Sequence, residues 1–294
     1  MPSRSDRSGS SGAGTMTAPP PGASTPAPAV GRGTPATGTP PGGWRGRGFG
    51  ERFGATERKD NWWALPLIQA VGLVVFFGYA TWAALQGNHF LYTEGGRDYL
   101  SPFYSPLFQP KWWPFSPALL ILGAPVGFRM TCYYYRKAYY RSFFADPAAC
   151  AVGELKSKGY CGELTFPFVL QNLHRYFLYL ALIFLFILWA DVVRAFTIGG
   201  RFGAGVGSFA ILASTALITL YTLSCHSLRH IVGGRLDCFS CVVAGGPRHQ
   251  AWSGVSALNA HHMGWAWWSL FAVCFADFWV RLCSLGVVHD PRLF

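Results

Sequence analysis

Long apolar stretches alternate with shorter polar ones over most of the chain. Runs with few charges cover residues 62–85, 112–135, 168–189, 205–231 and 257–285. A helix of about 20 apolar residues is long enough to cross the hydrocarbon core of a bilayer. The pattern therefore predicts an all-α membrane protein whose anchor domain, residues 57–294, is a bundle of five transmembrane helices. Three prolines in the second run predict kinks there, which membrane helices tolerate.

Residues 1–56 have a different composition, since they are rich in Pro, Gly, Ser, Thr and Ala with scattered Arg. Such a segment cannot bury enough apolar surface to order itself. It also lacks the apolar core of a signal peptide. We expect a disordered or extended N-terminal arm.

The charge distribution adds an orientation. The chain carries 24 Lys and Arg against 13 Asp and Glu, and the basic residues flank apolar runs. Because basic residues stay on the cytoplasmic side, the N-terminus and the loops 136–166 and 232–256 are predicted to be cytoplasmic and the C-terminus outside. Nucleic-acid binding is not needed to explain the charge. Eight cysteines without a regular pattern do not indicate a secreted disulfide scaffold.

The stretch CHSLRHIVGGRLDCFSC, residues 225–241, combines four side chains that bind metals. His226 and His230 lie four residues apart and so share one face of a helix. Two glycines follow, and then Cys238 and Cys241. Two imidazoles and two thiolates are the ligands of a Rieske-type [2Fe–2S] centre. Zinc bound by the same four ligands, or no metal at all, are the alternatives.

Most of the histidines gather at one membrane depth, the cytoplasmic ends of the predicted helices. A titratable layer of this kind indicates a redox or quinone site. A quinone needs an apolar slot and a donor at each carbonyl. The candidate quinone-binding residues are His174, Tyr176, Arg229, His262 and Trp265, with contacts to lipid headgroups as the alternative.

Charged residues also occur near the predicted outer ends of the third and fifth helices. Asp277 and Arg281 lie four residues apart and can pair along their helix. Pairing of Asp191 and Arg194 with these two residues, from helix to helix, is the simplest structural account. The functional alternative is that Asp277 changes protonation and lets protons enter from outside.

Several motifs together resemble the membrane-anchor subunit of actinobacterial succinate dehydrogenase, respiratory complex II. They are TCYYYRKAYYRSFF, QNLHRYF, LSCHSLRHIVGGRLDCFSC, LNAHHM and the pair Asp277-Phe278, and they cover all but the first 60 or so residues. The resemblance implies a five-helix anchor in the bacterial plasma membrane. It also implies a flavoprotein subunit and an iron–sulfur subunit on its cytoplasmic side, and electron transfer from succinate to a quinone, menaquinone.

The resemblance leaves the nature of the redox centre open. Anchors of the dihaem type carry four axial histidines, but here the outer halves of the helices have none. A single haem b between His174 and a histidine of the fourth or fifth helix is one hypothesis. Haem leaves Cys238 and Cys241 without a role, which favours the cluster. A purely structural anchor and a transporter are two further hypotheses, although the internal repeats typical of transporters are not seen.

The chain has no glycine-rich dinucleotide loop. We therefore expect that succinate oxidation belongs to the complex and that this subunit has no such activity alone.

Overall fold

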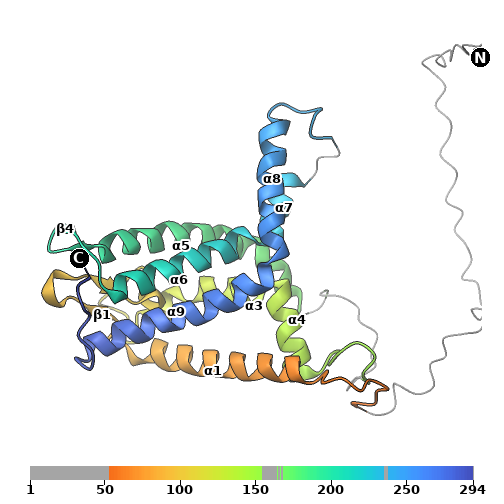
Figure 1. Cartoon of the computed structure of the whole chain (residues 1–294), viewed down its shortest axis with the longest axis horizontal. Coiled ribbons are helices and arrows are strands. Elements are labelled where there is room, and N and C mark those ends of the chain that lie inside the picture. Colours follow the sequence, from red (N-terminus) through yellow and green to blue (C-terminus); the bar gives the residue numbers. More distant parts are fainter. Residues whose placement is uncertain (1–52, 154–163, 165, 167, 235–237, 294) are drawn as a thin grey trace, which may run out of the picture. The chain divides into compact units, whose positions relative to one another are not determined.

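The computed structural model describes residues 53–153, 164, 166, 168–234 and 238–293. Four long helices dominate this part of the chain (Figure 1), and each is apolar and long enough to cross a membrane. They are α1 (Ala64–Gln86), α5 (His174–Ala195, preceded by a 3₁₀ segment, Phe168–Leu173), α6 (Val206–Leu223) and α9 (His262–Ser284). The prediction of a helical membrane protein is confirmed. The N-terminal arm falls almost entirely outside the described residues.

The second predicted span is interrupted. It consists of α2 (Ala118–Ile121), α3 (Gly123–Met130) and α4 (Tyr133–Tyr139), and a π turn continues α4 over Tyr140–Phe144. Cys132 has an extended backbone, φ −64° and ψ 129°, which separates α3 from α4. The interruptions agree with the kinks predicted for this span, and one of them falls at Cys132 and not at a proline. A fifth membrane crossing stays a prediction.

The fourth and fifth predicted spans each merge two helices. Cys225 is extended, with φ −63° and ψ 136°, and separates α6 from α7 (His226–Gly233). α8 (Gly245–Ala260) ends at His261, where α9 begins. Figure 1 shows α7 and α8 side by side and turned away from the direction of α6 and α9. The Arg229 guanidinium lies 5.1 Å from the Trp252 ring and links the two short helices.

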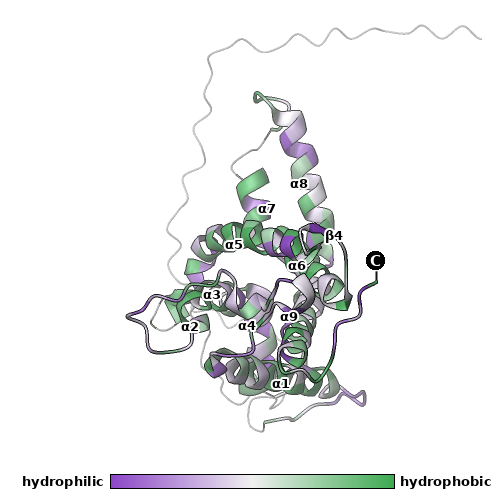
Figure 2. Ribbon diagram, turned by 90° about the vertical axis from the view of Figure 1, so that its left-hand side faces the viewer, coloured by the Kyte–Doolittle hydropathy of each residue, from purple (hydrophilic) through white to green (hydrophobic). Residues whose placement is uncertain are grey.

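The apolar surface matches a lipid environment. Only four residues of α1 are buried, and large apolar side chains such as Ile68, Val74 and Val75 are more than half exposed. Figure 2 shows hydrophobic residues along α1 and α5 and more hydrophilic residues on α8. Because an exposed aliphatic face is unfavourable in water, this surface fits contact with acyl chains.

The segment between α1 and α2 folds over one end of the helices. It contains the hairpin β1 (Leu91–Tyr92) and β2 (Tyr99–Leu100) and two 3₁₀ turns, Glu94–Gly96 and Pro102–Tyr104. A second hairpin, β3 (Thr197–Ile198) and β4 (Arg201–Phe202), joins α5 to α6. Tyr99 is fully buried, and its hydroxyl donates to the Asp290 carboxylate at 2.9 Å. Buried polar contacts thus fix the segment against α9 and the C-terminal residues.

Candidate functional site

Two histidines and two cysteines from four different helical segments meet inside the protein. The Nε2 atom of His174 lies 3.1 Å from the Sγ atom of Cys225, and the Nε2 atom of His262 lies 3.4 Å from the Sγ atom of Cys132. Cys132 and Cys225 are 3% and 1% exposed and belong to one hydrophobic cluster. Both are the extended residues that interrupt helices. The two breaks in the predicted spans therefore place these thiols inside the protein.

Two hydroxyl groups orient the imidazoles. Thr131 donates to the Gly127 carbonyl at 2.7 Å, and Ser224 donates to the Tyr221 carbonyl at 2.9 Å. Each hydroxyl has one hydrogen, so it accepts from the histidine beside it. His174 Nδ1 lies 2.9 Å from Thr131 Oγ1, and His262 Nδ1 lies 2.6 Å from Ser224 Oγ. Protonation at Nδ1 leaves the lone pair of each Nε2 atom directed at a cysteine, as in metal-binding histidines.

An aromatic ring stacks on each imidazole. Phe128 stacks on His174 with ring centroids 4.8 Å apart, and Tyr221 stacks on His262 at 5.0 Å. Phe128 and Tyr221 meet edge to face at 5.5 Å. The Tyr221 hydroxyl is buried without a hydrogen-bond partner among the described residues. A buried donor of this kind is costly unless the neighbouring Cys132 thiol, a water molecule or a bound group satisfies it.

The donor set fits a [2Fe–2S] cluster better than a single ion. In the described part of the chain, no three His, Cys, Asp or Glu side chains are placed to hold one metal ion. A Rieske-type cluster binds two histidines through one iron and two cysteines through the other. The four donors match that set in type and number, and each histidine here contacts one of the cysteines. Metal binding would have to displace the proton of each thiol.

The four metal ligands predicted from the sequence form two separate pairs on α7 and in the loop before α8. His226 and His230 lie on α7 with their Nε2 atoms 3.1 Å apart, and both are exposed. Burial, followed by the charges of His230 and Arg229, lowers the pKa of His226.

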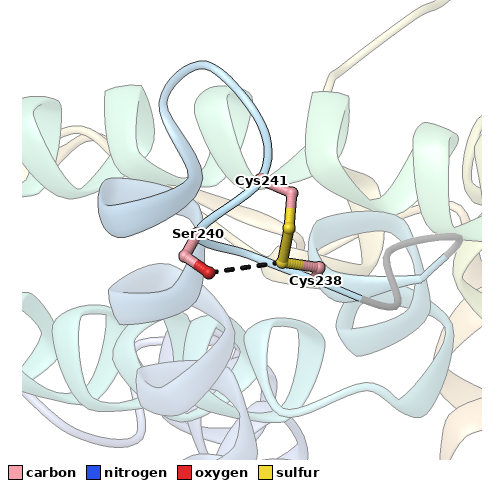
Figure 3. Close-up of a disulfide and its surroundings, with 3 residues drawn as sticks. All are labelled: Cys238, Ser240 and Cys241. Atoms are coloured by element: carbon pink, nitrogen blue, oxygen red, sulfur yellow. Dashed lines mark hydrogen bonds between the residues drawn. A yellow bond between two sulfur atoms is a disulfide. The ribbon is translucent and has the colours of Figure 1, made fainter. Parts of the chain in front are cut away.

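Cys238 and Cys241 form a disulfide with a Cα–Cα distance of 5.4 Å (Figure 3). The Sγ atom of Cys238 also lies 3.2 Å from Ser240 Oγ. A disulfide offers no thiolate to iron, so in this form His226, His230, Cys238 and Cys241 do not fit a cluster.

The predicted quinone-binding residues lie in several different places. His174 and His262 belong to the buried histidine–cysteine site. Trp265, on the first turn of α9, has a buried Nε1 without a partner among the described residues. Arg229 donates to Ser256 at 2.9 Å on the α7–α8 hairpin, and Tyr176 is 65% exposed. The structure therefore does not bring the five together, and their quinone role stays a prediction.

An apolar cavity of about 360 Å³ lies beside the buried site, between α1, α3, α5, α6 and α9. Phe128 and Tyr221 line both the cavity and the histidine–cysteine site. The polar part of its wall includes Arg129, Tyr135 and Tyr221. Arg129 donates to the Tyr135 hydroxyl at 2.7 Å and to Ser269 Oγ at 3.1 Å. The cavity thus offers an apolar volume with a few fixed polar groups.

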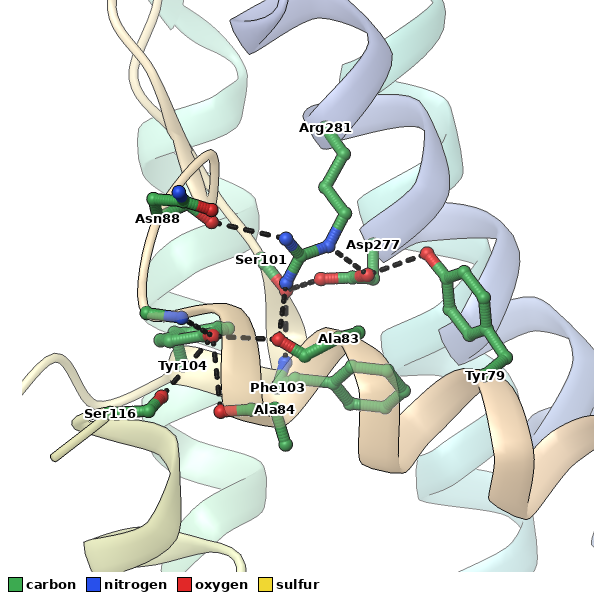
Figure 4. A network of polar contacts seen from close by, with 11 residues as sticks. Tyr79, Ala83, Ala84, Asn88, Ser101, Phe103, Tyr104, Ser116, Asp277 and Arg281 are labelled. Carbon is green, nitrogen blue, oxygen red and sulfur yellow. Dashed lines mark hydrogen bonds and ion pairs between the residues drawn. The ribbon is translucent and has the colours of Figure 1, made fainter.

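A separate polar network surrounds Asp277, which is fully buried (Figure 4). Its Oδ2 atom accepts from Tyr79 at 2.6 Å and from Arg281 Nε at 2.7 Å, and its Oδ1 atom accepts from Ser101. Arg281 also donates to the Ala83 carbonyl at 2.8 Å.

The charged residues of α5 and α9 each pair within their own helix. Asp277 pairs with Arg281 as predicted from their spacing, and Asp191 lies 3.5 Å from Arg194. Asp191 also accepts from the Ser105 hydroxyl. The expectation that the α5 and α9 charges pair with each other is wrong, because residues three and four apart on a helix are already neighbours.

Sequence reasoning missed that Cys132 and Cys225 lie against His262 and His174. The available signal was the position of both cysteines, each at the edge of an apolar run and close in depth to His174 and His262.

The apolar helices, the buried histidine–cysteine site and the adjoining cavity define a helical membrane protein with an internal polar centre. Residues 64–286 match the family described as actinobacterial succinate dehydrogenase subunit SdhC. The chain belongs to this family and is a membrane-anchor subunit.

A solved structure agrees with this assignment. A chain of the Mycobacterium smegmatis Sdh1 complex in the apo form is 39% identical, with a TM-score of 0.74, over 81% of this chain and 94% of that one. None of the curated proteins matches the sequence.

Proposed function

We propose that this subunit passes electrons from an iron–sulfur subunit to a membrane quinone, menaquinone, through a Rieske-like [2Fe–2S] centre. The observation that supports it is the buried set of Cys132, His174, Cys225 and His262 beside an apolar cavity. A flavoprotein subunit would oxidise succinate and supply the electrons. The complex would sit in the bacterial plasma membrane, with these partners on the cytoplasmic side.

The chain's own residues would hold and tune the centre. Cys132 and Cys225 would provide thiolates, and His174 and His262 would provide neutral imidazoles oriented by Thr131 and Ser224. When bound, a centre of this type accepts and releases one electron, and its histidine ligands raise its reduction potential above that of an all-cysteine cluster. Burial of both cysteines would keep water from the thiolates, and the Tyr221 hydroxyl lies buried beside them.

The cavity would receive the quinone. Its volume falls within the roughly 300–1,000 Å³ typical of small-molecule sites, which are mostly apolar with a few fixed polar groups. Tyr135 and Arg129 are such groups at its wall.

A single haem b held by His174 and His262 is the second candidate, because both Nε2 atoms face the interior. The thiols of Cys225 and Cys132 disfavour it, because they contact the two Nε2 atoms and a haem would leave both thiols without a role.

Spectroscopy of the purified complex tests the proposal. We expect a Rieske-type EPR signal after reduction and no haem in a pyridine haemochrome assay. Cys225→Ser should abolish the signal from this subunit, whereas Cys238→Ser should leave it unchanged. A haemochrome spectrum would identify the haem alternative. Loss of the signal in Cys238→Ser, with retention in Cys225→Ser, would return the cluster to the α7–α8 hairpin.

A further inference from the structure

Arg129 is a cation fixed at the wall of the apolar cavity. Besides its bonds to Tyr135 and Ser269, its NH1 group lies 3.5 Å from the Ala266 carbonyl. Its guanidinium lies 4.7 Å from the centre of the Tyr221 ring. Contacts with α4, α6 and α9 therefore fix the position of the guanidinium group.

No carboxylate balances this charge in the part of the chain that the structure describes. The ion pairs there join Arg58 to Asp60, Arg97 to Asp290, Arg194 to Asp191 and Arg281 to Asp277. Arg129 has only neutral partners. A cation in an apolar membrane protein is expensive unless it is compensated. Its position therefore indicates that negative charge is present nearby at some stage of function.

Arg129 lies next to the histidine–cysteine site. It precedes Cys132 by three residues, across the break between α3 and α4. The Tyr221 ring lies under its guanidinium and stacks on His262. The charge thus borders both the cavity and the proposed ligands.

We propose that Arg129 stabilises the reduced state of the redox centre and thereby raises its reduction potential. This inference rests on the proposed function. One electron from the iron–sulfur subunit would reduce one ferric ion to ferrous and so would make the centre more negative by one unit. A nearby fixed cation favours the more negative state, most strongly where water is excluded. Arg129 is a positioning charge in this proposal, not a ligand.

Redox titration of the purified complex, followed by the EPR signal of the reduced centre, tests the role of the charge. Arg129→Gln removes the charge and keeps a hydrogen-bond donor. We expect the ratio of reduced to oxidised centre at a fixed potential to fall at least tenfold, which equals a downward shift of about 59 mV for one electron. Arg129→Lys keeps the charge and should stay within threefold of the wild type.

Two further variants separate charge from structure. Arg136→Met removes a cation that lies 5.0 Å from the exposed Tyr133 ring and should not change the ratio. Ser269→Asp places a carboxylate beside Arg129 and should lower the ratio as Arg129→Gln does, so it replaces that variant if Arg129→Gln does not assemble.

The outcomes distinguish the two proposals. Absence of any Rieske-type signal in the wild type would overturn the proposed function and this inference with it. A normal signal whose ratio is the same in the wild type, Arg129→Gln and Ser269→Asp would overturn the inference alone. An equal fall in Arg129→Lys would do so as well, because it would show that guanidinium packing, not charge, sets the ratio.

Discussion

The Nε2 atom of His174 lies 3.1 Å from the Sγ atom of Cys225, although 51 residues separate them in the chain. The contact exists because the start of α5, at His174, lies beside the break between α6 and α7, at Cys225. His262 and Cys132 form the corresponding contact at 3.4 Å over 130 residues. Both histidine–cysteine contacts therefore depend on where the helices α4, α5, α7 and α9 begin.

The hydroxyls behind the histidines should control metal retention. Thr131→Val and Ser224→Ala each remove the acceptor of an Nδ1–H group and free the ring to turn. Loss of such an orienting partner typically lowers metal affinity about 10–100-fold. We expect both variants to lose iron to a chelator faster than the wild type. Colorimetric iron analysis measures this loss.

Thr219→Val provides the control for these variants. Thr219 donates to its own helix at 2.8 Å and contacts Trp189 instead of a proposed ligand. Iron loss from this variant should match the wild type. Unchanged retention in Thr131→Val and Ser224→Ala together would exclude the two histidines as ligands oriented in this way.

Filling the apolar cavity should weaken quinone reduction selectively. Val126 lines the cavity and is 46% exposed, so a larger ring can be accommodated without unfolding the helix. In Val126→Trp we expect the KM for quinone to rise roughly tenfold, since occupied volume is lost to the ligand. Succinate oxidation by a soluble dye should keep its rate.

Val193→Trp is the matched control, because Val193 is 67% exposed on α5 and does not line the cavity. Its KM should equal that of the wild type. Equal loss of quinone and dye activity in Val126→Trp would indicate impaired assembly and would count against the cavity as a quinone site.

Asp277 should contribute mainly to stability. Asp277→Asn leaves Arg281 buried without its counter-charge, and breaking a buried pair costs about 3–5 kcal/mol. We expect a clear fall in the thermal unfolding midpoint of the complex in detergent. Asp191→Asn should cost about 1 kcal/mol or less, since the side chain of its partner Arg194 is 62% exposed.

The same variant tests proton entry. All the contacts of Asp277 are those of an ionised carboxylate that accepts from three donors. We therefore expect Asp277→Asn to keep the full dependence of succinate oxidation on membrane potential in vesicles. A variant that assembles normally but shows a weaker dependence would instead support Asp277 as a proton entry residue.

The pKa of His226 on α7 should depend on its neighbour His230. The pKa of His226 is lowered from 6.5 by burial first and then by the charges of His230 and Arg229. In His230→Gln the repulsion disappears, so the pKa of His226 should rise towards 6.5, as followed by NMR of labelled histidines.

Because its pKa is lowered in the folded state, His226 makes the stability of the protein depend on pH. The unfolded chain binds the His226 proton more tightly than the folded one, so stability rises with pH in this range. The contribution of His226 is complete above about pH 6.5 and is lost as the pH falls through its folded pKa. A His226 pKa that is unchanged in His230→Gln would contradict the coupling.

The sequence alone determined that the chain is a helical membrane protein, which family it belongs to, and roughly where its four long helices lie. Apolar runs such as residues 168–189 are unambiguous, because crossing a bilayer requires a length and a composition that few other structures need. It also placed His174 and His262 at one depth, since each begins an apolar run. The pairing of Asp277 with Arg281 followed from helical spacing.

Only the tertiary structure decided which side chains meet. A run of apolar residues does not show where a helix breaks, and extended backbones at Cys132 and Cys225 place both thiols in the interior. Proximity in the sequence suggested that His226 and His230 act together with Cys238 and Cys241. In the structure the two histidines contact each other on α7, and the two cysteines form a disulfide. Contacts over 51 and 130 residues are set by the packing of whole helices, which no local pattern encodes.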